Sequence, residues 1–565
     1  MKQFCADYTK LIYCFAVAAL LAFIATGYYK SDIVCIERLY SLYQILLVYI
    51  GVKLLYTISN KWTSVIIVFL TLIICSVESY KGVSQLLGFS HSNHFLYSVS
   101  GSFENPGPYG GFMSVCISLL AAFVVYNKSN QSKGLILSIS DRLITAICIV
   151  AFLALSASQS RSSILALMCS MSILLVRNRK ELILRYFKKY GLWIIAMVFV
   201  LFVGLYFIKK PSADGRFFMS KICVKAICSN NLSGAGMGCF GGQYGESQAY
   251  YFKQTIEQRN NDELDWTALD SNERMAADCP TNAFNEYLFI GIEFGWVAML
   301  LFVAMIVLSI VLSYQRGTIW CYGIITFAVF SLFSYPLHAT QLRLFLPILL
   351  ASCSSDRNKD STNKTFAINR TVLDKVKYAI GGLLIIGLFF YFKKIQPDII
   401  KYKKANSEWK QMLEWHHNDN EAYFSECCSA LYPFMQDNDW FLFMYGQSLH
   451  NLGNYEKSDS ILLVGTRISS DPMFWNIMGN NSLELGRYRE AEERYKHAFY
   501  MVPNRLYPLH LLAKLYHAER DTSRFMDMAE KVEKFIPKVE SVNTERLREE
   551  IRELKSGYCY NGKEN

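Results

Sequence analysis

Residues 285–313 read NEYLFIGIEFGWVAMLLFVAMIVLSIVLS and are apolar over nearly their whole length. A helix of about 20 apolar residues crosses the hydrocarbon layer of a membrane, so this stretch predicts a membrane-spanning helix. It carries two acids near its start, Glu286 and Glu293, and an acid at the edge of a span is costly unless it is used or paired. The stretch therefore predicts a membrane fold and marks one edge of it as a candidate site.

Similar apolar blocks recur along the chain of 565 residues, which is 52% hydrophobic and only 18% charged. This composition predicts an all-α, polytopic transmembrane helix bundle with about eleven spans. The first block follows a short basic start, but a second block begins at once without a cleavage site, so we interpret it as a retained helix rather than a signal peptide. The expected spans are roughly 11–27, 35–57, 63–80, 109–126, 142–157, 161–176, 191–208, 285–313, 318–334, 336–353 and 378–392.

Two basic loops orient the bundle. Residues 177–189 and 354–377 each hold six Lys or Arg, which predicts that both loops are cytoplasmic. With eleven spans they fall on the same side as the N-terminus, and the polar segment 209–284 and the tail after residue 393 then lie outside the cytoplasm. The net charge of +10 comes mainly from the cytoplasmic loops, so it does not imply a nucleic-acid partner.

The cysteines do not indicate a metal site. Most of the sixteen lie inside apolar spans, where a thiol behaves as a small hydrophobic group, and no pair of CxxC motifs occurs. We therefore expect no bound metal. Cys239 and Cys279 both lie in the external segment, where they could form a disulfide or remain free.

The tail contains a repeat pattern. Residues 471–503 have the spacing of a tetratricopeptide repeat, which is carried by Trp475, Gly479, Gly486, Tyr488, Ala491, Tyr495, Ala498 and Pro503. Weaker echoes precede and follow it, so we expect about three stacked helix pairs from about 404 to 540. The chain then divides into a membrane domain, 1–395, and a helical repeat domain, 400–565. Such a stack presents a concave surface that holds a peptide or partner protein, or it serves as a spacer.

Three further stretches are expected at the same membrane face as residues 278–295. SGSFENPGPYGGF at 100–112 has the Gly, Asn and Pro of a turn, whose backbone amides can point toward an anion. SASQSRSSILAL at 156–167 is a tight hairpin that places Arg161 at the interface, where it either extends to lipid headgroups or holds a phosphate. The segment 212–244 contains Arg216 and Lys221 and then a run of glycines that lacks the context of a nucleotide site.

These stretches gather basic residues and flexible backbone at one membrane face, above spans that are nearly free of charge. A transporter or a flippase for lipid-linked sugars would bury ionisable residues near the middle of its helices. The pattern favours a substrate with a tail in lipid and an anionic head at the interface, such as a polyprenyl diphosphate.

In this order the four stretches resemble the O-antigen ligase family of membrane glycosyltransferases. The family includes O-antigen ligases of lipopolysaccharide, O-antigen polymerases and bacterial protein O-oligosaccharyltransferases. The resemblance covers about residues 95 to 350, and it is carried by GSFENPG, SRSSIL, Arg216 followed by LSGAGMGCF, and FNEYLFIGIEFG.

The resemblance implies a reaction and its partners. Family members transfer a glycan from undecaprenyl diphosphate to an acceptor hydroxyl at the outer face of the bacterial inner membrane, without a nucleotide, a required metal or another cofactor. The implied partners are the lipid-linked donor, membrane lipid and an acceptor, which is lipid A core, another lipid-linked glycan or a protein serine or threonine. The external tail fits a protein acceptor or a protein partner, and it would be periplasmic.

By the same resemblance, Arg161 and Arg216 match the family arginines assigned to the diphosphate. The family's histidine before Asn-x-Tyr-Leu is replaced by Phe284, so another residue must act as general base. The candidates are Glu286, which we favour because partial burial would raise its basicity, and His338 in the external SYPLHATQ turn.

Other residues are expected in support. An alternative role for Glu286 is a favourable interaction with the helix dipole, and Glu293 is expected to pair with a base in the bundle. We expect substrate binding or hydrogen-bonding support from Asn105, Lys221, Asn282, Asn285, Tyr287 and Glu293. Because the histidine is missing, an alternative is a non-catalytic membrane scaffold that displays the repeats.

Overall fold

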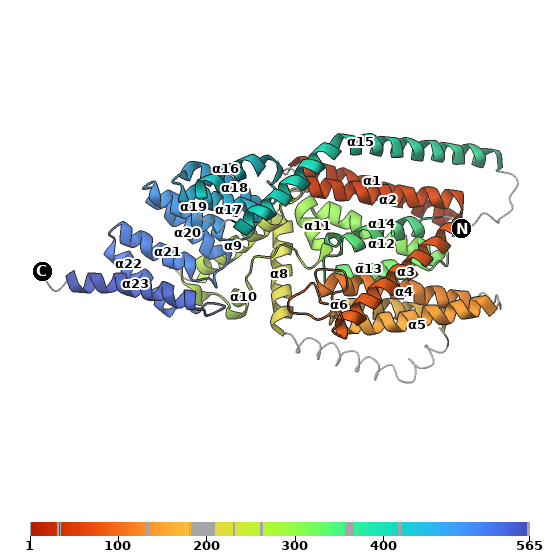
Figure 1. The fold of residues 1–565 in the computed structure, drawn as a ribbon, viewed down its shortest axis with the longest axis horizontal. Helices are drawn as coiled ribbons and strands as arrows, with labels where there is room; N and C mark the ends of the chain where they lie inside the picture. The colour runs from red at the N-terminus through yellow and green to blue at the C-terminus, as the bar shows by residue number, and fades with distance from the viewer. Residues whose placement is uncertain are drawn as a thin grey trace.

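The computed structural model describes residues 2–30, 33, 35–129, 135–179, 181, 210–229, 232–259, 264–355, 367–415 and 420–561. Within these ranges every regular element is an α- or 3₁₀-helix, so the all-α prediction is confirmed. Figure 1 shows a bundle of long helices beside an array of shorter ones, with helix α8 (Lys210–Ser229) standing between them.

Several helices of the bundle match the requirements of a membrane. Among the described residues, six helices are long and apolar enough to cross one: α1 (Lys2–Lys30), α2 (Ile36–Ile58), α3 (Asn60–Leu86), α4 (Pro106–Ser129), α5 (Leu135–Ala157) and α12 (Trp296–Gln315). Two shorter apolar helices, α13 (Trp320–Ser331) and α14 (Thr340–Cys353), pack among them. The chain is a multi-pass membrane protein.

Burial separates the centre of the bundle from its periphery. Of the apolar part of α4, 78% is buried, against 28% for α5 and 22% for α2. Helix α4 contacts α3, α5, α6 (Arg161–Asn178) and α13, so it forms the core. A helix that is apolar on all sides and half exposed suits a lipid environment.

The number of spans remains a prediction. The expected span 191–208 lies outside the described residues, and 378–392 lies within the long helix α15 (Ala367–Trp415). Helix α14 is only 14 residues long and contains Pro347.

The predicted single span 285–313 is wrong, because the chain breaks at Gly295. A nine-residue helix, α11 (Glu286–Phe294), ends there, and α12 begins at Trp296. Gly295 has φ +90°, and a Cβ at this position would lie 1.9 Å from the carbonyl oxygen of Leu232. The loop at 232–236 also ends α11, since Ala235 donates its N–H to Ile292 O at 2.8 Å. A helix of nine residues is too short to span the bilayer by itself, so α11 is not a membrane-spanning helix.

The break predicts the effect of a small substitution. We expect Gly295→Ala to destabilise the protein by at least about 1 kcal/mol, because alanine disfavours this backbone conformation and its Cβ meets backbone atoms. The midpoint of thermal unfolding in detergent measures the effect. Gly51→Ala is the control, since a Cβ at Gly51 in α2 meets nothing within 4 Å, and this substitution should stabilise by roughly 0.5–1 kcal/mol. An unchanged midpoint for Gly295→Ala would contradict the account of the break.

The remaining described helices lie before α11, between α13 and α14, and in the tail. The segment after α8 contains α9 (Phe240–Arg259), η1 (Trp266–Ala268) and α10 (Ser271–Ala276), and η2 (Pro336–His338) joins α13 to α14. The tail forms α16 (Glu421–Leu431), η4 (Tyr432–Phe434), α17 (Asp439–Asn451), α18 (Tyr455–Ile468), α19 (Met473–Glu484), α20 (Tyr488–Met501), α21 (Tyr507–Ala518), α22 (Thr522–Lys534) and α23 (Val542–Asn561).

The tail helices pack on their neighbours in sequence, α17 on α18, α19 on α20 and α21 on α22. Glycines allow the close approaches: a Cβ at Gly479 would lie 2.3 Å from the Tyr495 ring, and one at Gly446 would lie 2.4 Å from Leu462. Residues 404–415 belong to α15. The identity of the array as tetratricopeptide repeats, and the boundary at 395–400, remain predictions.

The tail is docked on the segment between α8 and α11. Helix α9 contacts α18 and α20, and Gly242 lies against the carbonyl groups at the end of α18. Buried hydrogen bonds cross the contact: Asn504 Nδ2 donates to Arg274 O and Ala277 O, both at 2.8 Å. The tail and this segment therefore lie on the same side of the bundle. Cys239 and Cys279 are not joined by a disulfide in this structure.

Candidate functional site

Arg161 lies at the end of the bundle that faces α8, and Arg216 lies on α8 itself. Arg161 is the first residue of α6, and Arg216 is on the first half of α8. Arg216 is exposed, and its Nη1 donates to Phe333 O, just after α13, at 3.1 Å. Its guanidinium carbon lies 4.7 Å from the ring centroid of Phe284.

Arg216 is bonded to the end of α13, and α6, which begins at Arg161, packs along α13, so both arginines belong to the same region. Desolvation and then the positive charge of Arg161 lower the pKa of Arg216, and the hydroxyls of Tyr335 and Tyr97 oppose this. The structure therefore brings together the two arginines that the sequence predicted as a pair. Two guanidinium groups at one end of a membrane bundle can hold a diphosphate through charge-assisted hydrogen bonds.

Phe284, which the resemblance places where the family has histidine, has a left-handed backbone conformation with φ 47°. This region is uncommon for a residue with a bulky side chain. The ring packs on Arg216 and lies 5.3 Å from the ring of Tyr335. The position therefore supplies an apolar wall to the arginine site, with no proton acceptor.

The ring of Tyr335, which contacts Phe284, also contacts the ring of His338. His338 is exposed, in η2, and its ring lies 6.0 Å from that of Tyr335 and 4.7 Å from that of Phe289. Although part of the residue is exposed, its ring packs against Phe289 and Tyr335, and this desolvation, together with the charges of Arg38 and Arg343, lowers the pKa of His338. Its imidazole is therefore neutral at neutral pH, and a neutral imidazole can accept a proton.

Glu286 is inside the protein. Its side chain is 2% exposed, and Oε2 accepts the N–H of Leu337 in η2 at 3.2 Å. Burial raises the pKa of Glu286 to about 8. Asn285 caps the helix, since its Oδ1 accepts the N–H groups of Tyr287 at 3.0 Å and Leu288 at 3.1 Å. These two residues hold α11 and η2 in place.

Glu293 is paired, as expected, with a base of the bundle. It has 0% exposure and forms an ion pair of 2.6 Å with Arg38 at the start of α2. Its Oε1 also accepts the N–H of Gly238 at 3.0 Å. Tyr287 donates its hydroxyl to Ala328 O at 3.0 Å. Both side chains fix α11 within the protein. These contacts do not direct either side chain toward Arg161 or Arg216.

The remaining predicted residues lie in different surroundings. Asn105 Oδ1 accepts the N–H of Gly107 at 2.9 Å, at the start of α4. Lys221 donates to Glu273 at 2.5 Å and to Tyr251 at 2.8 Å, so its charge is largely neutralised away from Arg216. Asn282 has a buried Oδ1 that accepts no hydrogen bond.

Sequence reasoning missed Arg38, Tyr335 and the carbonyl of Phe333. Arg38 follows Glu37 in the first turn of α2, and two charges at the edge of an apolar block were the available signal. Nothing in the sequence pointed to Phe333, because it contributes a backbone carbonyl.

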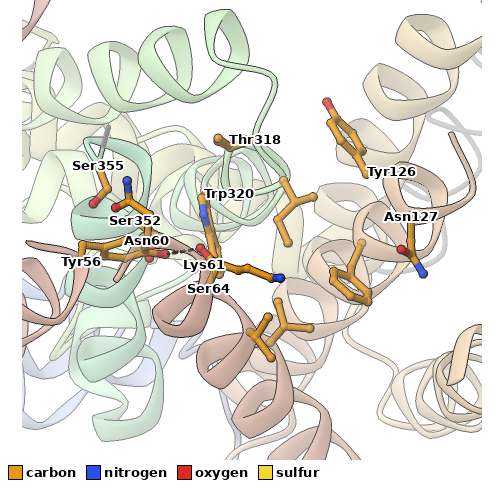
Figure 2. Close-up of a pocket in the computed structure, with 14 residues that line it drawn as sticks. Tyr56, Asn60, Lys61, Ser64, Tyr126, Asn127, Thr318, Trp320, Ser352 and Ser355 are labelled. Atoms are coloured by element: carbon orange, nitrogen blue, oxygen red, sulfur yellow. Dashed lines mark hydrogen bonds between the residues drawn. The ribbon is translucent and has the colours of Figure 1, made fainter. Parts of the chain in front are cut away.

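A cavity of about 370 Å³ lies at the opposite end of the bundle. Figure 2 shows Tyr56, Lys61, Asn127, Trp320 and Ser352 around it. Asn127 and Trp320, for example, lie at the ends of α4 and α13 that are remote from Arg161 and Arg216. The arginine site is separate from it. Among the described residues no cluster of His, Cys, Asp and Glu could hold a metal ion.

The fold and the arginine pair define a multi-pass membrane protein with a cationic site at one end of its bundle. Residues 146–303 match the model of the O-antigen ligase family, so this part of the chain is an O-antigen ligase domain and the resemblance is confirmed. The domain is of the ligase or polymerase type of membrane glycosyltransferase. The matched range includes Arg161, Arg216 and Glu286 and ends before His338. No curated protein matches the chain.

Proposed function

We propose that this protein transfers a glycan from undecaprenyl diphosphate to an acceptor hydroxyl at the outer face of the bacterial inner membrane. The observation that carries the proposal is the placement of Arg161 and Arg216 at the same end of the bundle, where the charge of Arg161 contributes to lowering the pKa of Arg216. The family match supports a polyprenyl-linked donor and a glycan acceptor in broad terms.

The two arginines have a clear chemical task in this reaction. When the bond between the sugar and the diphosphate breaks, negative charge develops on the departing diphosphate. Guanidinium groups positioned in advance stabilise that charge more than they stabilise the bound donor, which lowers the barrier. No metal ion is needed for this step, since the cationic groups are supplied by the chain.

The geometry favours His338 as the general base over Glu286. His338 is exposed and neutral, whereas Glu286 is buried and bonded to Leu337. The negative charge of a bound diphosphate would raise the pKa of the imidazole, because an opposite charge favours the protonated form. Glu286 then acts as a positioning residue, which holds the turn that carries His338.

This assignment predicts opposite outcomes at the two positions. Since the pKa of about 8 keeps Glu286 neutral at pH 7, Glu286→Gln preserves its shape, charge and bond to Leu337, and it should retain most of the transfer rate. His338→Ala should lower the rate about 100-fold, the loss of a general base. Both are measured as kcat for donor consumption. Loss of activity in Glu286→Gln together with normal activity in His338→Ala would reverse the assignment.

The transfer reaction itself is tested with purified protein in detergent. Undecaprenyl-diphosphate glycan is incubated with each acceptor class in turn: lipid A core, a second lipid-linked glycan and a protein with serine and threonine residues. Consumption of donor with only the second lipid-linked glycan would identify a polymerase. No consumption with any acceptor would refute the proposal and favour a non-catalytic scaffold.

A further inference from the structure

A cavity of about 610 Å³ lies where the O-antigen ligase domain meets the tail helices. Its wall is formed by the start of α2, the loops around 238–241 and 279–281, α15, and the segments 437–443 and 468–474. Sites for small molecules have volumes of roughly 300–1,000 Å³. The junction is closely packed along α9, so this cavity is a local opening in a contact that is otherwise tight.

Carboxylates are the most frequent charged groups in its polar lining. Four carboxylates line the cavity: Glu37, Asp437, Asp439 and Asp471. Arg38 is the basic residue among the lining residues, and its guanidinium is paired with Glu293. Asp471 is paired with Arg505 at 3.0 Å, whereas no such cation is paired with Glu37 or Asp439 in the described part of the chain, so the lining is more acidic than the arginine site. It suits a ligand that donates many hydrogen bonds and carries no negative charge.

Asp437 is costly to the folded protein. Its Oδ1 is buried and has no hydrogen-bond partner, and burial, with a contribution from the charge of Glu37, raises its pKa to about 7. The ordinary pKa of aspartate is about 3.9, so the folded state loses stability as pH rises from about 4 to 7. Buried polar groups without a partner are rare in folded proteins. Asp437 also lines the cavity, so a ligand hydroxyl there can donate a hydrogen bond to its carboxylate.

An aromatic surface borders these carboxylates. Trp440 is 52% exposed, and its ring stacks on that of Phe443 with centroids 5.7 Å apart. Tyr402 lies on another wall and donates its hydroxyl to Glu37 at 3.2 Å. A flat aromatic ring packs against the C–H face of a sugar, while carboxylates accept hydrogen bonds from its hydroxyls. The cavity combines these two kinds of group.

The cavity and the arginine site lie on either side of α11. Phe240 lines the cavity, and its ring lies 5.0 Å from that of Phe289, which in turn lies 4.7 Å from His338. Arg38 lines the cavity too, and its charge lowers the pKa of His338. One layer of side chains on α11 therefore separates a ligand in the cavity from the candidate base.

We propose that this cavity binds the part of the acceptor that does not react, as an uncharged, hydroxyl-rich oligosaccharide, and that Asp437 and Trp440 determine its specificity. The inference rests on the proposed function, because it assigns the acceptor of that reaction. A phosphorylated acceptor is disfavoured by the four carboxylates, and a peptide lacks the sugar face that Trp440 would contact. The tail helices thereby become part of the enzyme, since they supply both residues.

The test measures binding to the full-length protein in detergent. The probe is the neutral oligosaccharide fraction that mild acid releases from the polyprenyl-linked glycans of the source organism, and the readout is saturation-transfer NMR with a titration. We expect Asp437→Ala and Trp440→Ala each to weaken binding about tenfold, since each removes one main contact. Trp440→Phe should retain most of the affinity and shows that the fold tolerates change at this position.

Asp527→Asn is the matched control, because Asp527 is exposed on α22 and makes only a surface ion pair with Lys531. Unchanged binding in both alanine variants, no binding by wild type, or tighter binding of a lysine-rich peptide than of the oligosaccharide would overturn the inference. Donor consumption is measured in parallel. If wild type consumes donor while the cavity variants bind normally, the inference fails and the proposed function stands. If wild type consumes no donor, the proposed function itself fails.

Discussion

Arg216→Ala is expected to reduce glycan transfer by about 1,000-fold while the protein remains folded. The guanidinium is exposed, and its contacts are the carbonyl of Phe333 and the ring of Phe284, so its loss leaves no buried charge without a partner. What is lost is stabilisation of the departing diphosphate. The effect should appear mainly in kcat, because negative charge on the diphosphate is greatest in the transition state.

Two further variants give this prediction its controls. Arg216→Lys keeps the charge but loses the planar, two-pronged donor, so an intermediate loss is expected. Lys225→Ala removes a cation from the same helix, where it lies over the ring of Tyr251 at 4.9 Å, and should leave transfer unchanged. Purified variants are compared for donor consumption after a check by size exclusion. Equal rates for wild type and Arg216→Ala would refute the role of the arginine pair.

The membrane fold could be predicted because its signal is local. Each apolar block of sufficient length predicts a helix without reference to the rest of the chain, and α2, α3, α4 and α5 fall where such blocks occur. The break between α11 and α12 could not be predicted in this way. It depends on Leu232, whose carbonyl oxygen occupies the space that a side chain at residue 295 would need.

The same distinction between local and remote determinants applies to the candidate site. The proximity of Arg161 and Arg216 followed from placing two loops at one membrane face. The surroundings of Glu286 and Glu293 did not, because their partners are remote in sequence. Leu337 is 51 residues from Glu286, and Arg38 is 255 residues from Glu293. An acid at the mouth of an apolar block has the same sequence pattern whether it faces substrate or the protein interior.

These remote contacts give α11 a central place in the molecule. One end of the helix is tied through Glu286 to the turn that carries His338, and the other is tied through Glu293 to Arg38 and Gly238. The helix lies between the proposed acceptor cavity and the arginine site. Its anchors should therefore govern both stability and the alignment of the two substrates.

Arg38→Ala is accordingly expected to destabilise the protein by about 3–5 kcal/mol, because it leaves the carboxylate of Glu293 buried without its cation. Glu293 has 0% exposure, and the N–H of Gly238 is a weaker partner than the guanidinium. The effect is measured as a lowered midpoint of thermal unfolding in detergent. Lys404→Ala provides the comparison, since its ion pair with Glu408 is exposed and should contribute less than about 1 kcal/mol.

A double variant separates the charge from the packing. Arg38→Met combined with Glu293→Leu removes both charges and keeps comparable volume, so it should recover most of the stability lost in Arg38→Ala. Its transfer rate should nevertheless stay below that of wild type, because Glu293 no longer accepts the N–H of Gly238 and the loop beside the cavity loses a contact. If Arg38→Ala unfolds at the same temperature as wild type, Glu293 has another partner and α11 is held by different forces.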